Sequence, residues 1–183
     1  MVLNRRTFLK TGVAGFGSIM LLPSCLKPSG PYRFFTSEEA KCIIALCEQI
    51  IPADGHGGGA TEAGVIHYID KQLTAVFHYD QVKYQRGIAG VQHSCLDLYG
   101  KRFEALDAGT QTVFLKKMET DELPEVYWTS VTPSGFFNLV IDHTMQGFYG
   151  PPRHGGNKDY MSYRMMDLEY PLVIGRNHYN HSI

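Results

Sequence analysis

The N-terminal part of the chain has no acidic residue before Glu38, and the apolar run within it is short. Arg5, Arg6 and Lys10 precede that run, residues 12–22, which carries no charge. Eleven residues of helix rise only about 16 Å, roughly half of the ~30 Å hydrocarbon core of a bilayer. The run is therefore too short to span a membrane, and basic residues before a short apolar run are typical of a secretory leader.

The basic residues of the leader belong to a motif. Residues 4–10, NRRTFLK, resemble the bacterial twin-arginine signal over its whole core. The residues that carry this resemblance are Arg5, Arg6, Phe8 and Leu9. The resemblance implies export by the twin-arginine route, which generally carries proteins that are already folded, often with a cofactor or a partner bound. We therefore predict that residues 1–24 are a twin-arginine signal peptide.

The leader closes with LPSC, residues 22–25, which resembles a lipoprotein processing site. In that interpretation Cys25 becomes the new N-terminus and carries acyl chains, so that residues 25–35 form a lipid-anchored tether in the periplasm. The alternative is ordinary cleavage nearby, which leaves Cys25 as a thiol.

Basic residues are scarce once the leader is removed. Residues 1–24 hold three of the 17 basic residues and none of the 18 acidic ones, which leaves 14 against 18 and a net charge near −4. This balance excludes an electrostatic surface for nucleic acid. The remaining 159 residues suit one domain with one core. Tryptophan occurs once, against eleven tyrosines and ten phenylalanines, a content of aromatic residues that excludes a disordered chain.

Cysteines are too few and badly spaced for a disulfide framework. Four are present, and lipidation of Cys25 would leave an odd number. Cys42 and Cys47 lie five positions apart in a predicted helix, about 140° from each other around its axis, so they cannot pair within it. We expect buried thiols. Whether Cys95 meets either of them in the fold stays open.

Apolar spacing predicts a mainly α-helical domain over residues 36–183. Thr36 and Glu39 match a capping box before a first helix that ends near Pro52. Thr61 is expected to cap a second helix, a third spans 80–99, a short one follows Asp107, and Pro133 opens a last long one. The expected apolar faces are Ala40, Ile43, Ile44, Cys47 and Ile51; Val65, Ile66, Ile69, Leu73 and Val76; Tyr84, Ile88, Val91, Cys95 and Leu98; Val113, Phe114 and Met118; and Phe136, Phe137, Val140, Ile141 and Thr144.

The C-terminal part, residues 147–171, breaks the helical pattern. Its glycines and prolines exclude a regular helix over its first half, while its aromatic residues exclude a solvated linker. Such a segment has to pack on something. It either covers the core of its own domain or forms a surface that a partner binds.

Motifs that carry catalysis are not found in the sequence. His56, His67 and His78 lie eleven positions apart, and no histidine pair has the i,i+4 spacing with a carboxylate that helical metal sites use. Cys-x-x-Cys-His, Gly-x-Ser-x-Gly and phosphate-binding lysine loops are also missing. We therefore predict no catalytic residue, metal ligand or cofactor-binding residue in this chain.

Two blocks of the sequence carry a family resemblance. The first block is IIPAD (residues 50–54), GATEAGV (59–65) and Ile69-Asp70. The second is FYG (148–150), Pro152, Gly155-Gly156-Asn157 and Tyr170-Pro171. In this order the blocks resemble the small (gamma, subunit 3) family of gluconate 2-dehydrogenase. One departure is Ser162-Tyr163, where members of the family commonly have Gly-Trp.

The resemblance implies a non-catalytic small subunit of an exported flavin-dependent sugar or polyol dehydrogenase. FAD and the oxidation of the sugar hydroxyl would belong to a large subunit of the glucose-methanol-choline type, which the small subunit accompanies through export and stabilises. A cytochrome c subunit could complete such a complex. The alternative class is a free-standing periplasmic lipoprotein enzyme, or a metal- or ligand-binding module, that uses the histidines.

The second block also supplies the predicted contact with the large subunit. Prolines restrict the chain before binding, and glycines allow a partner backbone to approach closely. A tyrosine ring can bury while its hydroxyl still finds a partner. The predicted interface residues are Phe148, Tyr149, Pro152, Gly155, Gly156 and Asn157.

Overall fold

The computed structural model describes residues 30–55 and 57–168. Several predicted features lie outside these residues: Arg5, Arg6, Phe8 and Leu9 of the signal, Cys25, Tyr170-Pro171, and the histidines His56, His178 and His181. Within the described part, helices are the only regular secondary structure, which confirms the mainly α-helical prediction. None of the described helices is long and apolar enough to cross a membrane.

The helices follow one another in an order close to the prediction. The α-helices are α2 (Ser37–Ile50), α3 (Val65–Leu73), α4 (Gln81–Tyr99), α5 (Ala108–Glu119), α6 (Pro133–Tyr149) and α7 (Met161–Met165). Short 3-10 helices lie between them: η1 (His78–Asp80), η2 (Phe103–Ala105), η3 (Glu125–Tyr127), η4 (Pro152–His154) and η5 (Lys158–Tyr160).

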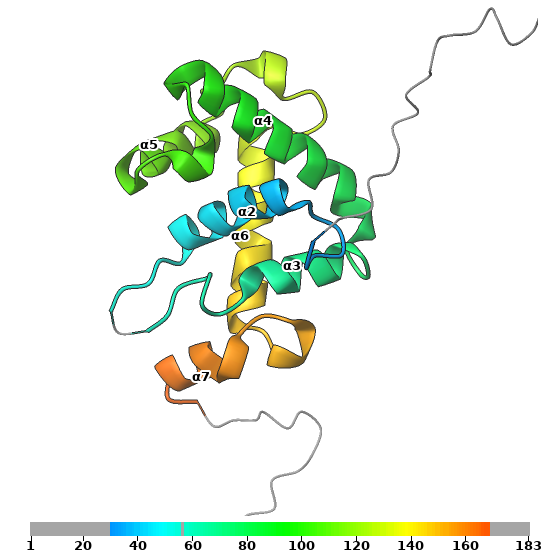
Figure 1. Cartoon of the computed structure of the whole chain (residues 1–183), viewed down its shortest axis with the longest axis vertical. Coiled ribbons are helices and arrows are strands. Elements are labelled where there is room, and N and C mark those ends of the chain that lie inside the picture. Colours follow the sequence, from blue (N-terminus) through cyan, green and yellow to red (C-terminus); the bar gives the residue numbers. More distant parts are fainter. Residues whose placement is uncertain (1–29, 56, 169–183) are drawn as a thin grey trace, which may run out of the picture.

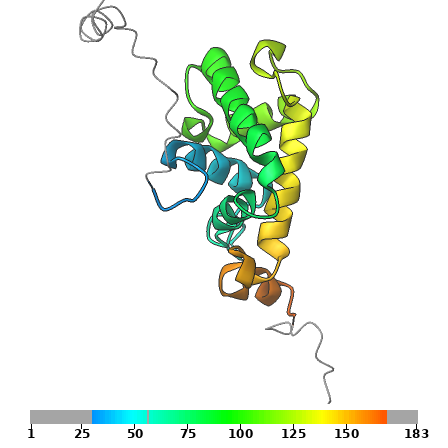
Figure 2. The same ribbon diagram turned by 90° about the vertical axis from the view of Figure 1, so that its right-hand side faces the viewer.

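Helix α6 organises the domain. It contacts α2, α3, α4, α5 and α7, and in Figure 1 it runs vertically behind α2. Figure 2 shows α6 along one side, with α4, α2 and α3 stacked beside it. The two ends of α6 therefore lie at opposite ends of the molecule: α5 and η3 near its start, α7 near its finish (Figure 1).

Side-chain caps start three of the helices, and the sequence predicts the first of them. In α2 the Thr36 hydroxyl accepts from the Glu39 N–H at 3.2 Å, while the Glu39 carboxylate accepts from the Thr36 N–H at 2.8 Å. Asp107 caps α5 by accepting from the Thr110 N–H. Thr132 caps α6, with Pro133 at the first helical position. These local bonds satisfy backbone N–H groups that have no partner inside the helix.

The start and end of α3 differ from the prediction. Gly64, in the left-handed conformation at φ 71°, precedes the helix, and Thr61 does not cap it. The Thr61 N–H and hydroxyl instead donate to the Glu48 carboxylate, at 2.9 and 2.6 Å. The helix ends at Leu73, so Val76 lies beyond it and is 64% exposed. Pairing with a distant carboxylate thus overrides the local preference of Thr61 for a cap.

Two residues assigned to apolar faces also point outward. Leu98 in α4 and Val113 in α5 are exposed, whereas their neighbours Cys95 and Phe114 are fully buried. Helical spacing shows which residues share a face, but not how far along the helix a neighbouring element covers that face. The core itself is aromatic and aliphatic; its largest fully buried members are Phe35, Ile43, Leu46, Ile69, Leu73, Tyr84, Phe103, Phe114, Met118, Phe136 and Phe148.

The three described cysteines are free and buried, which confirms the expectation of buried thiols and settles the open question about Cys95. Burial raises the pKa of Cys47 to about 12, and likewise that of Cys95. The Cys47 sulfur accepts from the Thr144 hydroxyl of α6 at 3.2 Å. These thiols therefore stay protonated and act as packing groups.

A buried carboxylate fastens the beginning of the domain to α3. Asp70 is 4% exposed and accepts three consecutive backbone N–H groups, those of Arg33, Phe34 and Phe35, at 2.7, 2.9 and 3.2 Å. Hydrogen bonds to an ionised acceptor are the stronger kind. They hold the chain so that the Phe35 ring enters the core against Tyr84.

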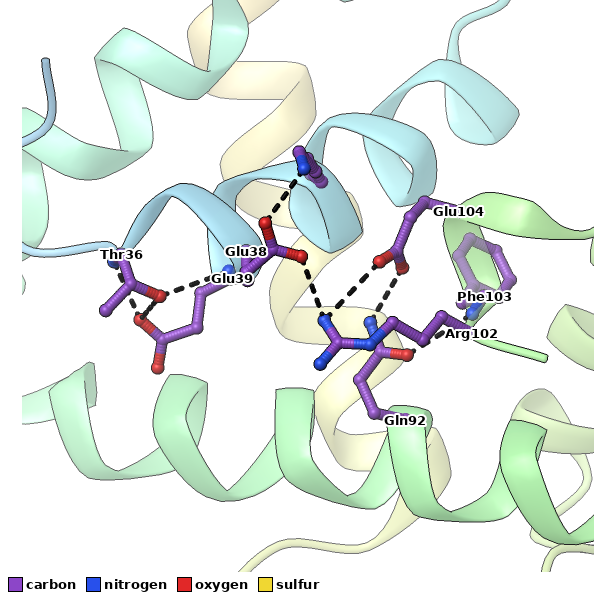
Figure 3. Close-up of polar contacts among 8 residues, drawn as sticks. Thr36, Glu38, Glu39, Gln92, Arg102, Phe103 and Glu104 are labelled. Carbon is purple, nitrogen blue, oxygen red and sulfur yellow. Dashed lines mark hydrogen bonds and ion pairs between the residues drawn. The ribbon is translucent and has the colours of Figure 1, made fainter. Parts of the chain in front are cut away.

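A polar network joins α2 to α4 through η2 (Figure 3). The Glu38 carboxylate pairs with Lys41 at 2.8 Å and with Arg102 at 3.1 Å. The Gln92 side-chain amide donates to the Glu104 carboxylate at 2.7 Å, and its side-chain carbonyl accepts from the backbone N–H of the buried residue Phe103. A cavity of about 220 Å³ lies beside this network. Because Glu38 and Arg102 already pair with each other, the network serves to hold η2 in place.

Candidate partner-binding segment

The chain turns back on itself after α6. We call residues 147–168 the C-terminal segment; it comprises the last turn of α6, η4, η5 and α7. Figure 1 shows it at the lower end of the molecule, beneath α3 and α6. It contacts both helices, through η4 on α3 and through α7 on α6. The segment thus covers part of its own domain, one of the two alternatives that the sequence left open.

Hydrogen bonds and a close backbone contact attach the C-terminal segment to α3 and the first sequence block. The Lys158 N–H donates to the Ala63 carbonyl at 3.0 Å, and the Lys71 ammonium donates to the Arg153 carbonyl at 2.9 Å. A Cβ atom on Gly155, where φ is 113°, would lie 3.1 Å from the His67 carbonyl oxygen. The two blocks, far apart in the sequence, are therefore one packed junction in space.

Gly156 makes the closest approach in this junction. A Cβ atom there would lie 2.1 Å from the carbonyl oxygen of Gly147 in α6 and 2.8 Å from its carbonyl carbon. Backbone atoms cannot move aside as a flexible side chain can. The position therefore requires glycine for space, although its φ is not in the left-handed region.

Asn157 holds the turn that follows. It is fully buried at φ 46°, its side-chain amide donates to the Gly150 carbonyl at 2.9 Å, and its side-chain carbonyl accepts from the Ser162 N–H at 2.9 Å. Asparagine tolerates left-handed backbone better than most residues and satisfies both sides of the turn here. Asn157 is therefore a structural residue of the C-terminal segment.

The C-terminal segment concentrates backbone strain. Five non-glycine residues in the described part have positive φ, and four of them are here: Asn157, Asp159, Tyr160 and Asp167. Ser162 lies between Tyr160 and Asp167 in the sequence. Its hydroxyl is the only buried side-chain oxygen or nitrogen of the described residues without a hydrogen-bond partner. Strained backbone of this kind gathers at binding and switch sites.

The predicted interface residues have different surroundings. Phe148 is 1% exposed, and Gly156 and Asn157 are buried as well, so these three build the segment and face their own domain. This corrects the expectation that the Phe148 ring is offered to a partner. Pro152 and Gly155 are half-buried. Tyr149 is 42% exposed and packs edge-on against Phe148, so its ring is supported from behind.

The exposed apolar residues at this end were missed by the sequence interpretation, apart from Tyr149. Each is between 42% and 45% exposed, and they come from the last turns of α6, from α7 and from the residues after it. We call them the apolar end: Met145, Tyr149, Met165, Met166 and Leu168. Exposed apolar side chains of this size are candidates for a protein contact.

The glycines between α2 and α3 pack against methionines of α7. A Cβ atom on Gly57 would lie 2.5 Å from the Met165 sulfur, and one on Gly58 would lie 2.7 Å from the Met161 sulfur. The same residues, with Arg164, line a cavity of about 280 Å³. Methionine is an adaptable side chain at binding surfaces, and here it connects the loop between α2 and α3 to the C-terminal segment.

The described histidines do not form a metal centre. No group of three or more histidine, cysteine or acidic residues in the described part is placed to hold a metal ion. His143 lies in the core, where its Nδ1 hydrogen-bonds the Tyr84 hydroxyl at 3.0 Å and its ring stacks on Phe77 at 4.5 Å. Burial lowers the pKa of His143 below its ordinary value. These contacts show that His143 packs the core of the domain.

Comparison with known proteins places the chain in a family. The family model described as gluconate 2-dehydrogenase subunit 3 matches residues 37–169, from the start of α2 to the end of the C-terminal segment. The matched region contains nearly all of both sequence blocks and the junction between them. No curated protein and no solved structure gave a match.

Proposed function

The chain belongs to the gluconate 2-dehydrogenase subunit 3 family, and on this basis we propose that it is the non-catalytic small subunit of an exported flavin-dependent dehydrogenase of a sugar or polyol. Its role is to accompany the large catalytic subunit through export and to stabilise it. The large subunit, of the glucose-methanol-choline type, carries FAD, and a cytochrome c subunit can complete the complex.

The observation that carries this proposal is the apolar end. Five large apolar side chains are exposed there, one on α6 and four on the C-terminal segment, which hydrogen bonds and close glycine contacts lock to α3 and α6. A segment that is rigid before binding loses little conformational freedom when a partner covers it. A domain built in this way offers a preformed surface to another protein.

Export and anchoring are further parts of the proposal. The twin-arginine signal would bring the chain to the periplasm, and acyl chains on Cys25 would hold it at a membrane. Replacing Arg5 and Arg6 by lysine keeps the positive charge but removes the motif, so we expect export to stop. Cys25→Ser is expected to release the domain into the soluble periplasmic fraction, because it removes the residue that carries the acyl chains on which stable attachment depends.

Copurification with the large subunit tests the proposed partnership. Coexpression of the chain with the flavoprotein should yield a complex, and Tyr149→Ala should weaken it by about 2 kcal/mol or more, the scale of an interface hot spot. Tyr79→Ala is the matched control, since Tyr79 is 62% exposed and lies in η1, outside the C-terminal segment. Equal affinities of the two variants would show that the interface lies outside the apolar end. Failure of the wild-type chain to copurify would refute the partnership.

A further inference from the structure

A second candidate site lies at the opposite end of α6. A cavity of about 490 Å³ opens there, between the end of α5 and the start of α6. This volume falls in the range of ligand pockets, roughly 300–1,000 Å³. Its lining residues are Asp121, Leu123, Glu125, Trp128, Thr129, Thr132 and Pro133.

One wall of this cavity is the only tryptophan of the chain, Trp128. The indole ring lies on α4 at Gly90, where a Cβ atom would come within 2.9 Å of ring carbons. The indole N–H donates to the hydroxyl of Ser94, which is fully buried, at 3.2 Å. The ring is thus fixed by a glycine that makes room for it and by a hydrogen bond that orients it.

The charge of the cavity is negative. Asp121 and Glu125 are the ionisable residues in the lining, and none of the described residues that line it is basic. The Asp121 carboxylate accepts from the Ser134 N–H at 2.8 Å and from the Ser134 hydroxyl at 2.7 Å, and these bonds lower its pKa. Asp121 therefore stays ionised and offsets the positive end of α6.

Glu125 has a different environment. It is exposed at the start of η3, and it forms no ion pair within the described part of the chain. Lys116 and Lys117 lie in the last turn of α5, but neither lines the cavity. A carboxylate without a partner beside a fixed indole ring is suited to a cation, which gains from both the charge and the aromatic face.

We propose that this cavity binds a basic side chain, an arginine or a lysine, presented by a protein partner. The assignment of the occupant to a protein rests on the proposed function, since a complex subunit meets a partner surface. The net charge near −4 of the chain without its leader favours a basic partner surface. Tryptophan and arginine are the residue types most enriched among interface hot spots.

Fluorescence of the single tryptophan tests the site in the chain alone. N-acetyl-arginine amide, titrated into the full-length chain at low salt, should give a saturable change in emission. N-acetyl-citrulline amide has nearly the same shape without the charge, and we expect it to bind at least about fivefold more weakly. Equal responses to the two compounds would show that the cavity does not select a cation and would overturn the proposal.

Two charge variants separate the cavity from the general charge of the surface. Glu125→Gln should weaken binding of the arginine compound about fivefold. Glu122→Gln removes the same charge at a position three residues before Glu125. Glu122 is exposed and does not line the cavity, so the affinity for the arginine compound should stay within about twofold. Equal weakening by both variants would indicate long-range attraction only and would overturn the proposal.

The complex then tests the source of the cation. With the copurified flavoprotein, Glu125→Gln and Trp128→Phe should each weaken association about tenfold, while Glu122→Gln should not. Melting of each variant shows whether it is folded. If Glu125→Gln loses binding of the arginine compound but assembles normally, the occupant is not a side chain of that partner. If the wild-type chain forms no complex, the proposed function fails, whereas the titration still decides whether the cavity selects cations.

Discussion

The two ends of α6 offer candidate contact surfaces of different construction. At its C-terminal end, close backbone contacts at Gly155 and Gly156 and strained turns hold the apolar end in place. At its N-terminal end, side chains form the site: Thr132 and Asp121 satisfy the first turn, and Trp128 rests on α4. The comparison indicates that the first surface should be sensitive to small changes of volume, and the second to changes of charge.

The largest expected effect is that of Gly156→Ala at the apolar end. The added methyl group would lie 2.1 Å from the Gly147 carbonyl oxygen, which belongs to the backbone of α6. We expect the free energy of unfolding to fall by about 3 kcal/mol, the upper part of the overpacking range. Urea denaturation measures the loss, and enhanced proteolysis of the C-terminal segment would locate it.

Gly109→Ala is the control for this substitution. Gly109 lies in the first turn of α5, where the added atom would come no closer than 3.3 Å to a side-chain oxygen of Asp107. Alanine is the better helix former, so stability should stay the same or rise by up to about 1 kcal/mol. A similar loss at both positions would show that glycine is needed for some reason other than the contact with α6.

The sequence predicted those features of the fold that depend on neighbouring residues. The Thr36 and Glu39 capping box and the helix starts after Asp107 and at Pro133 were predicted, because each depends on residues within one turn. Thr61 shows the limit. Its choice between capping α3 and pairing with Glu48 depends on where the end of α2 lies in the folded chain.

The candidate site was predicted less completely than the fold. The sequence pointed to Tyr149 and the glycines of the second block, but Phe148 faces the core because α6 continues through it. The exposed residues Met165, Met166 and Leu168 follow turns whose direction no local pattern indicates. The Trp128 cavity was not anticipated, since its walls come together only when η3 packs on α4.

His143, which lies in α6 between the two ends, gives a pH dependence that should involve neither surface. Burial lowers its pKa, so the unfolded chain binds a proton near pH 6.5 while the folded chain resists it. Stability should therefore fall as the pH drops below about 6.5, by at most about 1.4 kcal/mol per pH unit for one group. His143→Gln should remove this slope, measured by urea denaturation between pH 7 and 5. An unchanged slope in the variant would assign the effect to other groups.

Ser162→Ala should stabilise the C-terminal segment, which is the opposite of the effect expected for Gly156→Ala. The Ser162 hydroxyl is buried without a partner, whereas its N–H keeps the bond to Asn157 in either variant. Removing an unsatisfied buried polar group should raise the free energy of unfolding by about 1 kcal/mol. Ser94→Ala is the contrasting variant, because that buried hydroxyl accepts from Trp128 and its removal should destabilise the domain. If Ser162→Ala is destabilising, the hydroxyl has a partner in solution.

The smallest expected effect is at the N-terminal end of α6, from the exposed carboxylate of Asp121. Hydrogen bonds from the Ser134 N–H and hydroxyl lower its pKa below the ordinary value of 3.8. A carboxylate with a lowered pKa in the folded state contributes stability above its unfolded pKa, and this contribution is lost as the pH falls through the folded pKa. Asp121→Asn should therefore be slightly less stable than the wild-type chain at pH 7, and the difference should shrink below pH 3.8 and in high salt. Comparing the two chains at each pH cancels the titration of the other carboxylates. A difference that persisted unchanged into acid would mean that the charge of Asp121 does not hold the start of α6, and that this end, like the other, depends on packing.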